Sequence, residues 1–383
     1  MFEAGDLPEL IGQLCLVVAL FGCGYLLVAA VVVIRYRGIA SHPPLTPVPV
    51  SVLVPLCGQE PGLDRRLRAL RSQTYSAPVQ IICGIQDAND PVIDVVKAVA
   101  AEPLAHPLEF HVDPRLHGRN MKMSNMINMT QHAQHNTFVT VDSDVEIPPH
   151  LIATMVAELQ QPGVGAVSSL YHGIPVGGFW ARLAALRVNS HFLPNVVVAL
   201  SSGLAQPCFG AGMAFSRETL TRIGGFRAFT EQLWDDYAIG EAVRALGAKV
   251  VMSPISLGHV YAERSAREFF DGQLRNDRTI RGLDPIGHAG SIVTHPFPLA
   301  LIALLLGAGE HAVTVALLAL ACRTLLCWCT ERRFGVQPIS YLLLPLRDLL
   351  SFAIFVASYF GATVMWRGHR YRVADGELVA DPG

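Results

Sequence analysis

The sequence predicts an α/β domain with a mostly parallel sheet, flanked by transmembrane helices at both ends of the chain. With 51% hydrophobic and 16% charged residues among 383, the chain is more apolar than an ordinary soluble enzyme of this size. Residues 10–34 carry no charged side chain, and a membrane-spanning helix needs about 20 apolar residues. Between the apolar ends, short apolar runs alternate with helical periodicity, which is the order of an α/β domain.

The first apolar segment, residues 10–34, is expected to be an uncleaved membrane anchor. A signal peptide would begin with basic residues and end at a small-residue cleavage site, whereas this chain begins with acidic residues such as Glu3. Arg35 and Arg37 follow the apolar segment directly. By the positive-inside rule these arginines predict an integral membrane protein whose downstream chain lies in the cytoplasm.

Strand-like and helix-like patterns alternate from residue 50 to residue 141. Continuous runs rich in Val and Ile predict buried strands, and amphipathic spacing predicts helices. The expected strands are 50–55, 79–86, 108–112 and 137–141, and the expected helices are 63–73, 91–101 and 121–132. This order predicts a mostly parallel sheet with helices on both faces.

The C-terminal part of the chain is expected to form two or three further membrane spans. The apolar segments are 297–306, 312–330 and 349–366, and residues 180–200 form an amphipathic stretch expected at the membrane interface. Three spans would leave the basic tail that starts at Arg367 outside, against the charge bias. Either 297–306 is interfacial or re-entrant, or the tail lies at the far face. The expected domains are 1–37 (anchor), 38–285 (catalytic) and 286–383 (membrane domain and basic tail).

Acidic side chains follow two of the predicted strands. Asp87 comes after strand 79–86, and Asp142 and Asp144 come after strand 137–141. In open parallel sheets, ligands bind at the carboxyl ends of strands. Two carboxylates at positions i and i+2 can share Mg²⁺ or Mn²⁺, which prefer oxygen ligands. A solvated turn or a helix cap would also explain the acidic tripeptide.

A third acidic group, Asp235 and Asp236, opens a predicted helix that runs to about residue 246. Acids in a first helical turn are favoured by the helix dipole, which is one explanation. Repulsion between adjacent carboxylates can also raise the pKa of one of them and prepare it as a general base. Both interpretations remain open from the residues alone.

The composition argues against several other classes of site. The formal net charge of −2 and the absence of a basic motif exclude nucleic acid as an expected partner. The eight cysteines have no paired-ligand spacing, so neither a zinc site nor a redox dithiol is expected.

Five motifs in a fixed order carry a family resemblance. GIQDANDP, VDSDVEIPP, FGAGMAFSRETLTRIGGF, DDYAIG and QLRNDRTIR resemble the inverting GT-A glycosyltransferases related to ceramide glucosyltransferase. QPGVGAVSSLYHG and LAQPCFGAGMAFSRETL are similar to the bacterial hopanoid-biosynthesis glycosyltransferases. The likeness covers the chain from about Val50 through the C-terminal spans, and it implies a Rossmann-like GT-A domain.

The resemblance implies a UDP-sugar-dependent hexosyltransferase in the bacterial inner membrane. The expected donor is UDP-N-acetylglucosamine, and the expected acceptor is a hydroxyl of a membrane lipid, such as the hopanoid bacteriohopanetetrol. Transfer of glucose from UDP-glucose to ceramide is the alternative. A processive polysaccharide synthase would need more spanning helices, and an inactive membrane scaffold is a further alternative.

The resemblance also assigns roles on the donor side of the site. It implies that Asp87 holds the uracil or ribose end of the nucleotide and that Lys122 lies near the diphosphate. Asp142 would lie beside the donor and, with Asp144, would hold the divalent metal ion. An exposed helix lysine is the other explanation for Lys122.

The same resemblance implies that Asp236 is the general base, with Asp235 beside it. Gln273 and Arg275 match the part of the family motif that binds the leaving diphosphate. Asn276 stands where that motif has a tryptophan that packs against the acceptor region. This departure puts the acceptor geometry, or activity itself, in question, and it is the feature that suggests the scaffold alternative.

Overall fold

A computed structural model describes residues 6–37, 46–203, 206–338, 340–361, 363–366, 369–374 and 377–380. Glu3 and Arg367, on which two of the expectations above depend, lie outside these residues. The chain divides into two compact units. The sheet unit comprises Arg37–His172 and Gln206–Val260, and the helical unit comprises Met1–Tyr36, Gly173–Ala205 and Tyr261–Gly383. Residues 173–205 and 261–285, expected in the catalytic domain, therefore pack with the terminal helices.

The described strands of the sheet unit form one eight-stranded sheet. Its order is β3 (Leu108–Val112), β2 (Val79–Ile85), β1 (Val50–Leu56), β4 (Thr137–Val141), β7 (Gly212–Ser216), β6 (Val164–Pro175), β8 (Lys249–Tyr261) and β5 (Val145–Glu146). β1 pairs in parallel with β2 and β4, and β2 pairs in parallel with β3. β7 is antiparallel to β4 and β6, and β5 is antiparallel to β8. The α/β fold class is confirmed, with a sheet that is mixed beyond β4.

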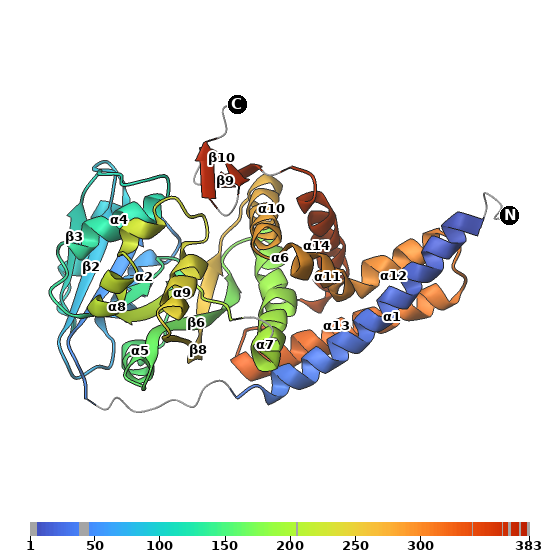
Figure 1. The fold of residues 1–383 in the computed structure, drawn as a ribbon, viewed down its shortest axis with the longest axis horizontal. Coiled ribbons are helices and arrows are strands. Elements are labelled where there is room, and N and C mark those ends of the chain that lie inside the picture. Colours follow the sequence, from blue (N-terminus) through green and yellow to red (C-terminus); the bar gives the residue numbers. More distant parts are fainter. Residues whose placement is uncertain are drawn as a thin grey trace. The chain divides into compact units, whose positions relative to one another are not determined.

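Helices cover both faces of this sheet (Figure 1). α2 (Leu63–Arg71), α3 (Val92–Ala100) and α5 (Leu151–Leu159) share one hydrophobic core with side chains of β1 such as Val52. α4 (Met121–Thr130), α8 (Arg217–Arg222) and α9 (Asp235–Ala245) pack on a second core that contains the adjacent Leu53. Successive strand residues point to opposite faces, so a continuous apolar strand feeds both cores. A 3₁₀ turn, η2 (Phe226–Phe229), also lies in the sheet unit.

The helical unit is built around three helices that lie side by side: α1 (Asp6–Arg35), α12 (Pro296–Leu305) and α13 (His311–Phe334) (Figure 1). The remaining elements are α6 (Phe179–Arg187), the π-helical turn η1 (Val188–Phe192), α7 (Leu193–Ser202), α10 (Ala266–Leu283), α11 (Pro285–Gly290), η3 (Ser291–Thr294), η4 (Tyr341–Leu343) and α14 (Leu344–Ser358). β9 (Thr363–Trp366), β10 (His369–Ala374) and β11 (Glu377–Ala380) form a small antiparallel sheet.

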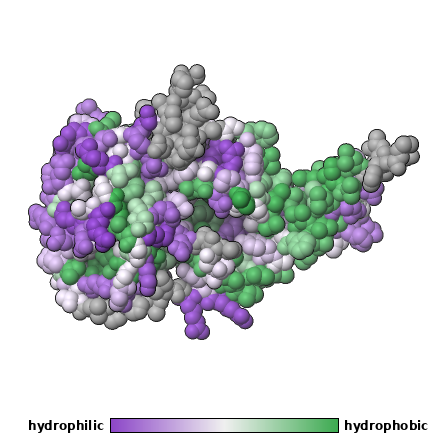
Figure 2. Space-filling view, in the orientation of Figure 1, coloured by the Kyte–Doolittle hydropathy of each residue, from purple (hydrophilic) through white to green (hydrophobic). Residues whose placement is uncertain are grey.

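Four helical stretches of the described chain are long and apolar enough to cross a membrane: Leu7–Arg35, Phe179–Ser202, His311–Phe334 and Tyr341–Ser358. The pair Pro285–Thr294 and Pro296–Leu305 is bent by 69°, as in a broken span or a re-entrant loop. Figure 2 shows hydrophobic residues gathered over α1, α12 and α13. The stretch around residues 180–200, expected at the membrane interface, thus forms 24 helical residues, which is long enough to span.

One expected span, residues 349–366, is wrong in its second half. Its helix, α14, ends at Ser358, and Thr363–Trp366 is strand β9. Gly361 has φ +90°, a left-handed conformation that a continuing helix cannot accommodate. Arg278 Nη2 donates to the Phe360 carbonyl at 2.6 Å, so a side chain of α10 satisfies a backbone group beyond the helix end.

Charged side chains are buried among the apolar helices of the helical unit. Arg323 of α13 and Arg347 of α14 are 0% and 1% exposed, and both form ion pairs with Asp348. Arg323 Nη1 also donates to the Ser190 carbonyl of η1 at 2.9 Å. Ionised groups inside a membrane segment are tolerated when they pair with one another or with backbone carbonyls.

Candidate active site

Asp142 and Asp144 lie at the carboxyl end of β4, where the chain turns into the short strand β5. The backbone of this turn is held from two sides. Asp142 N donates to the Ala211 carbonyl at 3.3 Å, and Val260 N donates to the Asp144 carbonyl at 2.8 Å. The two carboxylates are therefore presented by a turn that is hydrogen-bonded to the segments before β7 and within β8.

Arg66 of α2 supports the same turn and was not predicted from the sequence. Its guanidinium is buried at 3% exposure; Nε donates to the Ser143 carbonyl at 2.5 Å and Nη2 donates to Glu60 Oε2 at 3.1 Å. Ser143 Oγ donates to Glu60 Oε1 at 2.8 Å. Burial, and then the negative charge of Asp144, raise the pKa of Glu60. This network fixes the residue between the two aspartates.

Lys122 is the second residue of α4 and reaches the acidic turn. Its Nζ forms an ion pair with Asp142 Oδ1 at 2.6 Å. Burial alone would lower the pKa of Lys122, but the charges of Asp142, Asp235 and Asp236 outweigh burial and raise it. Burial raises the pKa of Asp142, and the ion pair with Lys122 opposes that rise. The structure thus places Lys122 against the carboxylate predicted to lie beside the donor.

Asp235 and Asp236 begin α9 and have different surroundings. Asp236 Oδ2 accepts a hydrogen bond from Gly210 N at 2.9 Å, and its Oδ1 accepts one from Tyr237 N at 2.8 Å. Asp235 is 8% exposed, and its Oδ2 accepts from Asn120 Nδ2 at 2.7 Å. Burial, and then the adjacent charge of Asp235, raise the pKa of Asp236 to about 6. A carboxylate with that pKa can accept a proton near neutral pH.

Asn120, the N-cap of α4, connects the lysine helix to the aspartate helix. It is fully buried; its Oδ1 accepts from Met123 N at 3.0 Å and its Nδ2 donates to the Gln232 carbonyl at 2.9 Å as well as to Asp235. The amide therefore caps one helix and holds the segment that leads into the other. An Asn before a helix predicts a cap from sequence, but nothing in the sequence indicates the contact with Asp235.

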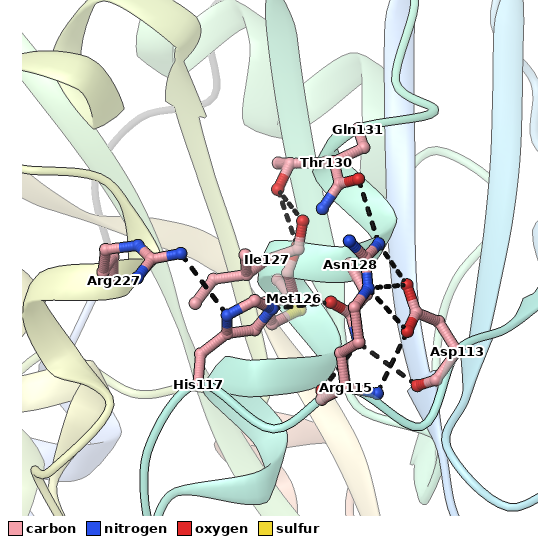
Figure 3. Close-up of polar contacts among 9 residues, drawn as sticks. All are labelled: Asp113, Arg115, His117, Met126, Ile127, Asn128, Thr130, Gln131 and Arg227. Atoms are coloured by element: carbon pink, nitrogen blue, oxygen red, sulfur yellow. Dashed lines mark hydrogen bonds and ion pairs between the residues drawn. The ribbon is translucent and has the colours of Figure 1, made fainter.

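Figure 3 shows how the loop before α4 is closed onto that helix. His117 Nε2 lies 2.8 Å from Asn128 Oδ1, and Arg227 Nη2 lies 3.4 Å from His117 Nδ1. Asn128 Nδ2 donates to the carbonyls of Asp113 and Arg115 at 3.2 and 3.0 Å. These contacts fold the loop back along the helix and so fix where α4, and with it Lys122, begins.

Asp87 follows β2, as predicted, but its described contacts stay within its own loop. It is exposed, and its Oδ1 accepts from Asn89 N at 2.9 Å. The neighbouring Asp90 makes the longer connection, because its Oδ2 accepts from Gly58 N in the loop after β1 at 2.7 Å. The role of Asp87 in holding the nucleotide stays a prediction.

Gln273 and Arg275 lie on α10 of the helical unit. Gln273 is 3% exposed, and its Oε1 accepts from Arg187 Nη1 at 2.6 Å. Arg187 also forms an ion pair with Asp277, one helical turn further on. Asn276, which replaces the expected tryptophan, is exposed. The contact of these residues with a leaving diphosphate stays a prediction.

The residues present fit a divalent cation that is shared with a substrate. Asp142 and Asp144 would hold it, and Asp144 Oδ1 is an enclosed oxygen with no hydrogen-bond partner in the structure. Within the described ranges, no group of three or more His, Cys, Asp or Glu side chains could enclose a metal ion. Mg²⁺ in sites that handle phosphates is held by one or two carboxylates together with the phosphates, so a site with two carboxylates is consistent with that chemistry.

The fold of this chain is that of a GT-A-like glycosyltransferase, as the similarity to a solved structure shows. The mannosyltransferase PcManGT from Pyrobaculum calidifontis, solved with GDP-Man and Mn²⁺, is similar to this chain with a TM-score of 0.54. The similarity covers 92% of this chain and 99% of that chain at 20% sequence identity. The chain belongs to glycosyl transferase family 21, whose sequence profile matches residues 14–379.

One characterised enzyme is also similar to this chain in sequence. Ceramide glucosyltransferase 1 of Caenorhabditis elegans is 23% identical over 248 residues, which are 61% of this chain. The match spans 52% of that protein, about half its length. The family resemblance expected from the five motifs is therefore confirmed, whereas the hopanoid acceptor stays a prediction.

Proposed function

We propose that this protein transfers a sugar from a UDP-sugar to a hydroxyl group of a membrane lipid, with inversion at the anomeric carbon. The observation that carries the proposal is the convergence of Lys122, Asp142 and Asp236 at one edge of the sheet. Gly210 connects them: a Cβ atom on this residue would lie 3.1 Å from Lys122 Nζ and 3.5 Å from Asp236 Oδ2. The cation proposed for the leaving group and the base proposed for the attacking group thus both lie beside one glycine.

The departing nucleotide carries negative charge away from the sugar. As the bond from the anomeric carbon to the diphosphate oxygen breaks, its electron pair leaves with the diphosphate. Lys122, paired with Asp142 in the sheet unit, is the side chain that we assign to compensating this charge. A divalent metal ion held by Asp142 and Asp144 would supply further electrostatic stabilisation of the diphosphate when bound.

Asp236 is the proposed general base. It accepts the proton of the lipid hydroxyl while that oxygen forms its bond to the anomeric carbon. Two backbone amides fix the carboxylate, and burial together with the charge of Asp235 raises its pKa. Asp235 itself is tied to Asn120 and is the positioning partner. A single displacement needs no covalent intermediate on the enzyme, so no nucleophile is assigned.

The proposed acceptor is a hopanoid polyol such as bacteriohopanetetrol, and the proposed sugar is N-acetylglucosamine, at the cytoplasmic face of a bacterial inner membrane. Several apolar helices of the chain could cross a membrane, which supports an acceptor that is itself a lipid. Transfer of glucose to ceramide is the second candidate, favoured by the similarity to ceramide glucosyltransferase 1.

The experiment is a transfer assay on the full-length protein in detergent. UDP-N-acetylglucosamine, UDP-glucose and GDP-mannose, each radiolabelled, are offered with bacteriohopanetetrol or with ceramide, with and without Mn²⁺. Asp236→Asn removes the proposed base, and Asp271→Asn is the matched control, because Asp271 is an exposed acid of α10 that pairs at the surface with Arg267.

A labelled lipid that forms with wild type and Asp271→Asn, but falls by about 100-fold or more with Asp236→Asn, is the expected result. Product from bacteriohopanetetrol and UDP-N-acetylglucosamine alone would establish the first candidate, and product from ceramide and UDP-glucose the second. Full activity of Asp236→Asn would remove the base from the mechanism. No product from any pair, with UDP still bound, would favour the inactive scaffold.

A further inference from the structure

Lys122 lies among carboxylates, and one of them, Asp142, is also a proposed ligand of the metal ion. Its Nζ is 2.6 Å from Asp142 Oδ1, in an ion pair whose side chains are 17% and 28% exposed. Asp142 is also one of the two carboxylates proposed to hold the divalent ion. The charges of Asp235 and Asp236 face the same ammonium group from α9. An ammonium and a divalent ion repel each other, and both attract the same carboxylate.

We infer that Lys122 and the metal ion compete for Asp142, and that the nucleotide diphosphate relieves this competition by offering Lys122 a second anionic partner. The inference rests on the proposed function, because it takes the metal and the nucleotide as ligands of this site. Binding of the nucleotide draws Lys122 from Asp142, and the freed carboxylate then binds the metal more tightly. Metal affinity is thereby made dependent on the nucleotide.

The surroundings of Lys122 support an alternative position for its ammonium group. A Cβ atom on Gly210 would meet Lys122 Nζ at 3.1 Å, so glycine at this position avoids crowding the ammonium group, and the lysine side chain is 17% exposed. Other contacts of the acidic turn do not involve Lys122: Arg66 holds Ser143, and backbone bonds hold Asp142 and Asp144. The turn therefore keeps its conformation when the lysine leaves it.

The test measures Mn²⁺ binding to the full-length protein in detergent by electron paramagnetic resonance of free Mn²⁺, with and without UDP. Lys122→Met removes the ammonium group and keeps an unbranched side chain, and Lys122→Gln is the second variant should the first fail to fold. Arg119→Met is the matched control, because it removes the same charge three residues away from a side chain paired with Glu231. Asp142→Asn removes the shared carboxylate.

Without UDP, we expect Lys122→Met to bind Mn²⁺ about tenfold more tightly than wild type. UDP should also increase the Mn²⁺ affinity of Lys122→Met about tenfold less than it increases that of wild type. Arg119→Met changes neither quantity by as much. When Lys122→Met is combined with Asp142→Asn, it no longer tightens Mn²⁺ binding, because no shared ligand is left.

Unchanged or weaker Mn²⁺ binding by both lysine variants would overturn the inference while leaving the proposed function in place. An equal gain from Lys122→Met with and without the Asp142→Asn substitution would also overturn it, because the effect would then be long-range repulsion. If wild type binds neither UDP nor Mn²⁺, the proposed function fails, and the inference fails with it.

Discussion

Asp235 and Asp236, at the start of α9, are identical side chains whose different hydrogen-bond partners give them different properties. Asp235 is tied to the amide of Asn120, whereas Asp236 is held by two backbone amides and lies beside Gly210. Asp236 is half-buried whereas Asp235 is buried, and burial together with the charge of Asp235 raises the pKa of Asp236 to about 6. The difference depends on partners that are distant in sequence. Asn120, the partner of Asp235, lies more than 100 positions away, and Gly210, the partner of Asp236, lies 26 positions away.

We expect kcat/KM for sugar transfer to fall as the pH drops below about 6. Asp236 accepts a proton only when it is ionised, and its raised pKa places the loss of that form near this pH. Above this pH the acid limb is flat. The pH profile of kcat/KM measures the ionisation in the free enzyme, and because the two aspartates interact, the value belongs to the pair. Asp271→Asn should leave the limb in place, and a profile that stays flat well below pH 6 would contradict the assignment.

At the residue scale, the carboxylates were predictable and their supports were not. The positions of Asp142, Asp144 and Asp236 at the end of a strand or the start of a helix could be predicted because these are local patterns, and their roles stay predictions. Arg66 and Asn120 carry no such pattern: each is ordinary for a helix or a cap, and its role arises from contacts made across the fold. The 2.6 Å ion pair of Lys122 with Asp142 could not be predicted from the sequence either, because the two residues belong to different elements.

At the scale of elements, α1 packs closely against the segment that joins η3 to α12, and one glycine permits this contact. A Cβ atom on Gly22 would lie 2.4 Å from the Val293 carbonyl oxygen and 2.9 Å from Pro296 Cβ. A Cβ atom on Gly24, two positions further along α1, would have no neighbouring atom within 4 Å. The two glycines therefore occupy opposite environments on one helix.

Gly22→Ala and Gly24→Ala should change stability in opposite directions. The added methyl group at Gly22 forces α1 away from its neighbour, which costs about 1–3 kcal/mol. At Gly24 the same methyl group meets no neighbour, and alanine favours the helix by up to about 1 kcal/mol. Thermal unfolding of the purified protein in detergent measures both shifts. Equal midpoints for the two variants would mean that α1 does not make this contact.

The elements themselves were largely predictable between residues 50 and 141. All seven expected strands and helices are present, and their ends differ from the predicted ones by at most two residues. Periodicity was sufficient there because buried parallel strands and amphipathic helices have distinct patterns. It was insufficient near the C-terminus, where hydropathy continues past Ser358 but Gly361 turns the chain into β9. Hydropathy measures how apolar the side chains are, and it does not distinguish a helix from an apolar strand.

At the scale of the whole molecule, Arg35 and Arg37 come directly after the first apolar helix and predict an orientation in a membrane. By the positive-inside rule we propose that the chain that follows them lies in the cytoplasm. Cys57, in the loop after β1, is exposed and can report on this orientation. The positive-inside rule depends on the positions of charged residues and not on the fold, so the orientation could be predicted from the sequence alone.

A membrane-impermeant maleimide should label Cys57 only after the inner membrane has been permeabilised. The readout is labelling of the protein in intact spheroplasts and in permeabilised ones. Cys57→Ser should remove the label from permeabilised spheroplasts. Glu9→Cys, in the first turns of α1 at the end opposite Arg35, should be labelled in intact spheroplasts. Labelling of Cys57 without permeabilisation would reverse the orientation.

The shared carboxylate of Asp348 also bears on how the protein is made. An arginine at the centre of a membrane helix costs about 2.5–3.5 kcal/mol to insert alone. Arg323 lies on α13, whereas the aspartate that neutralises it lies on α14, which is synthesised later. If α13 crosses the membrane, its arginine is therefore neutralised by a carboxylate only once α14 has been made, so we expect the two helices to stabilise each other.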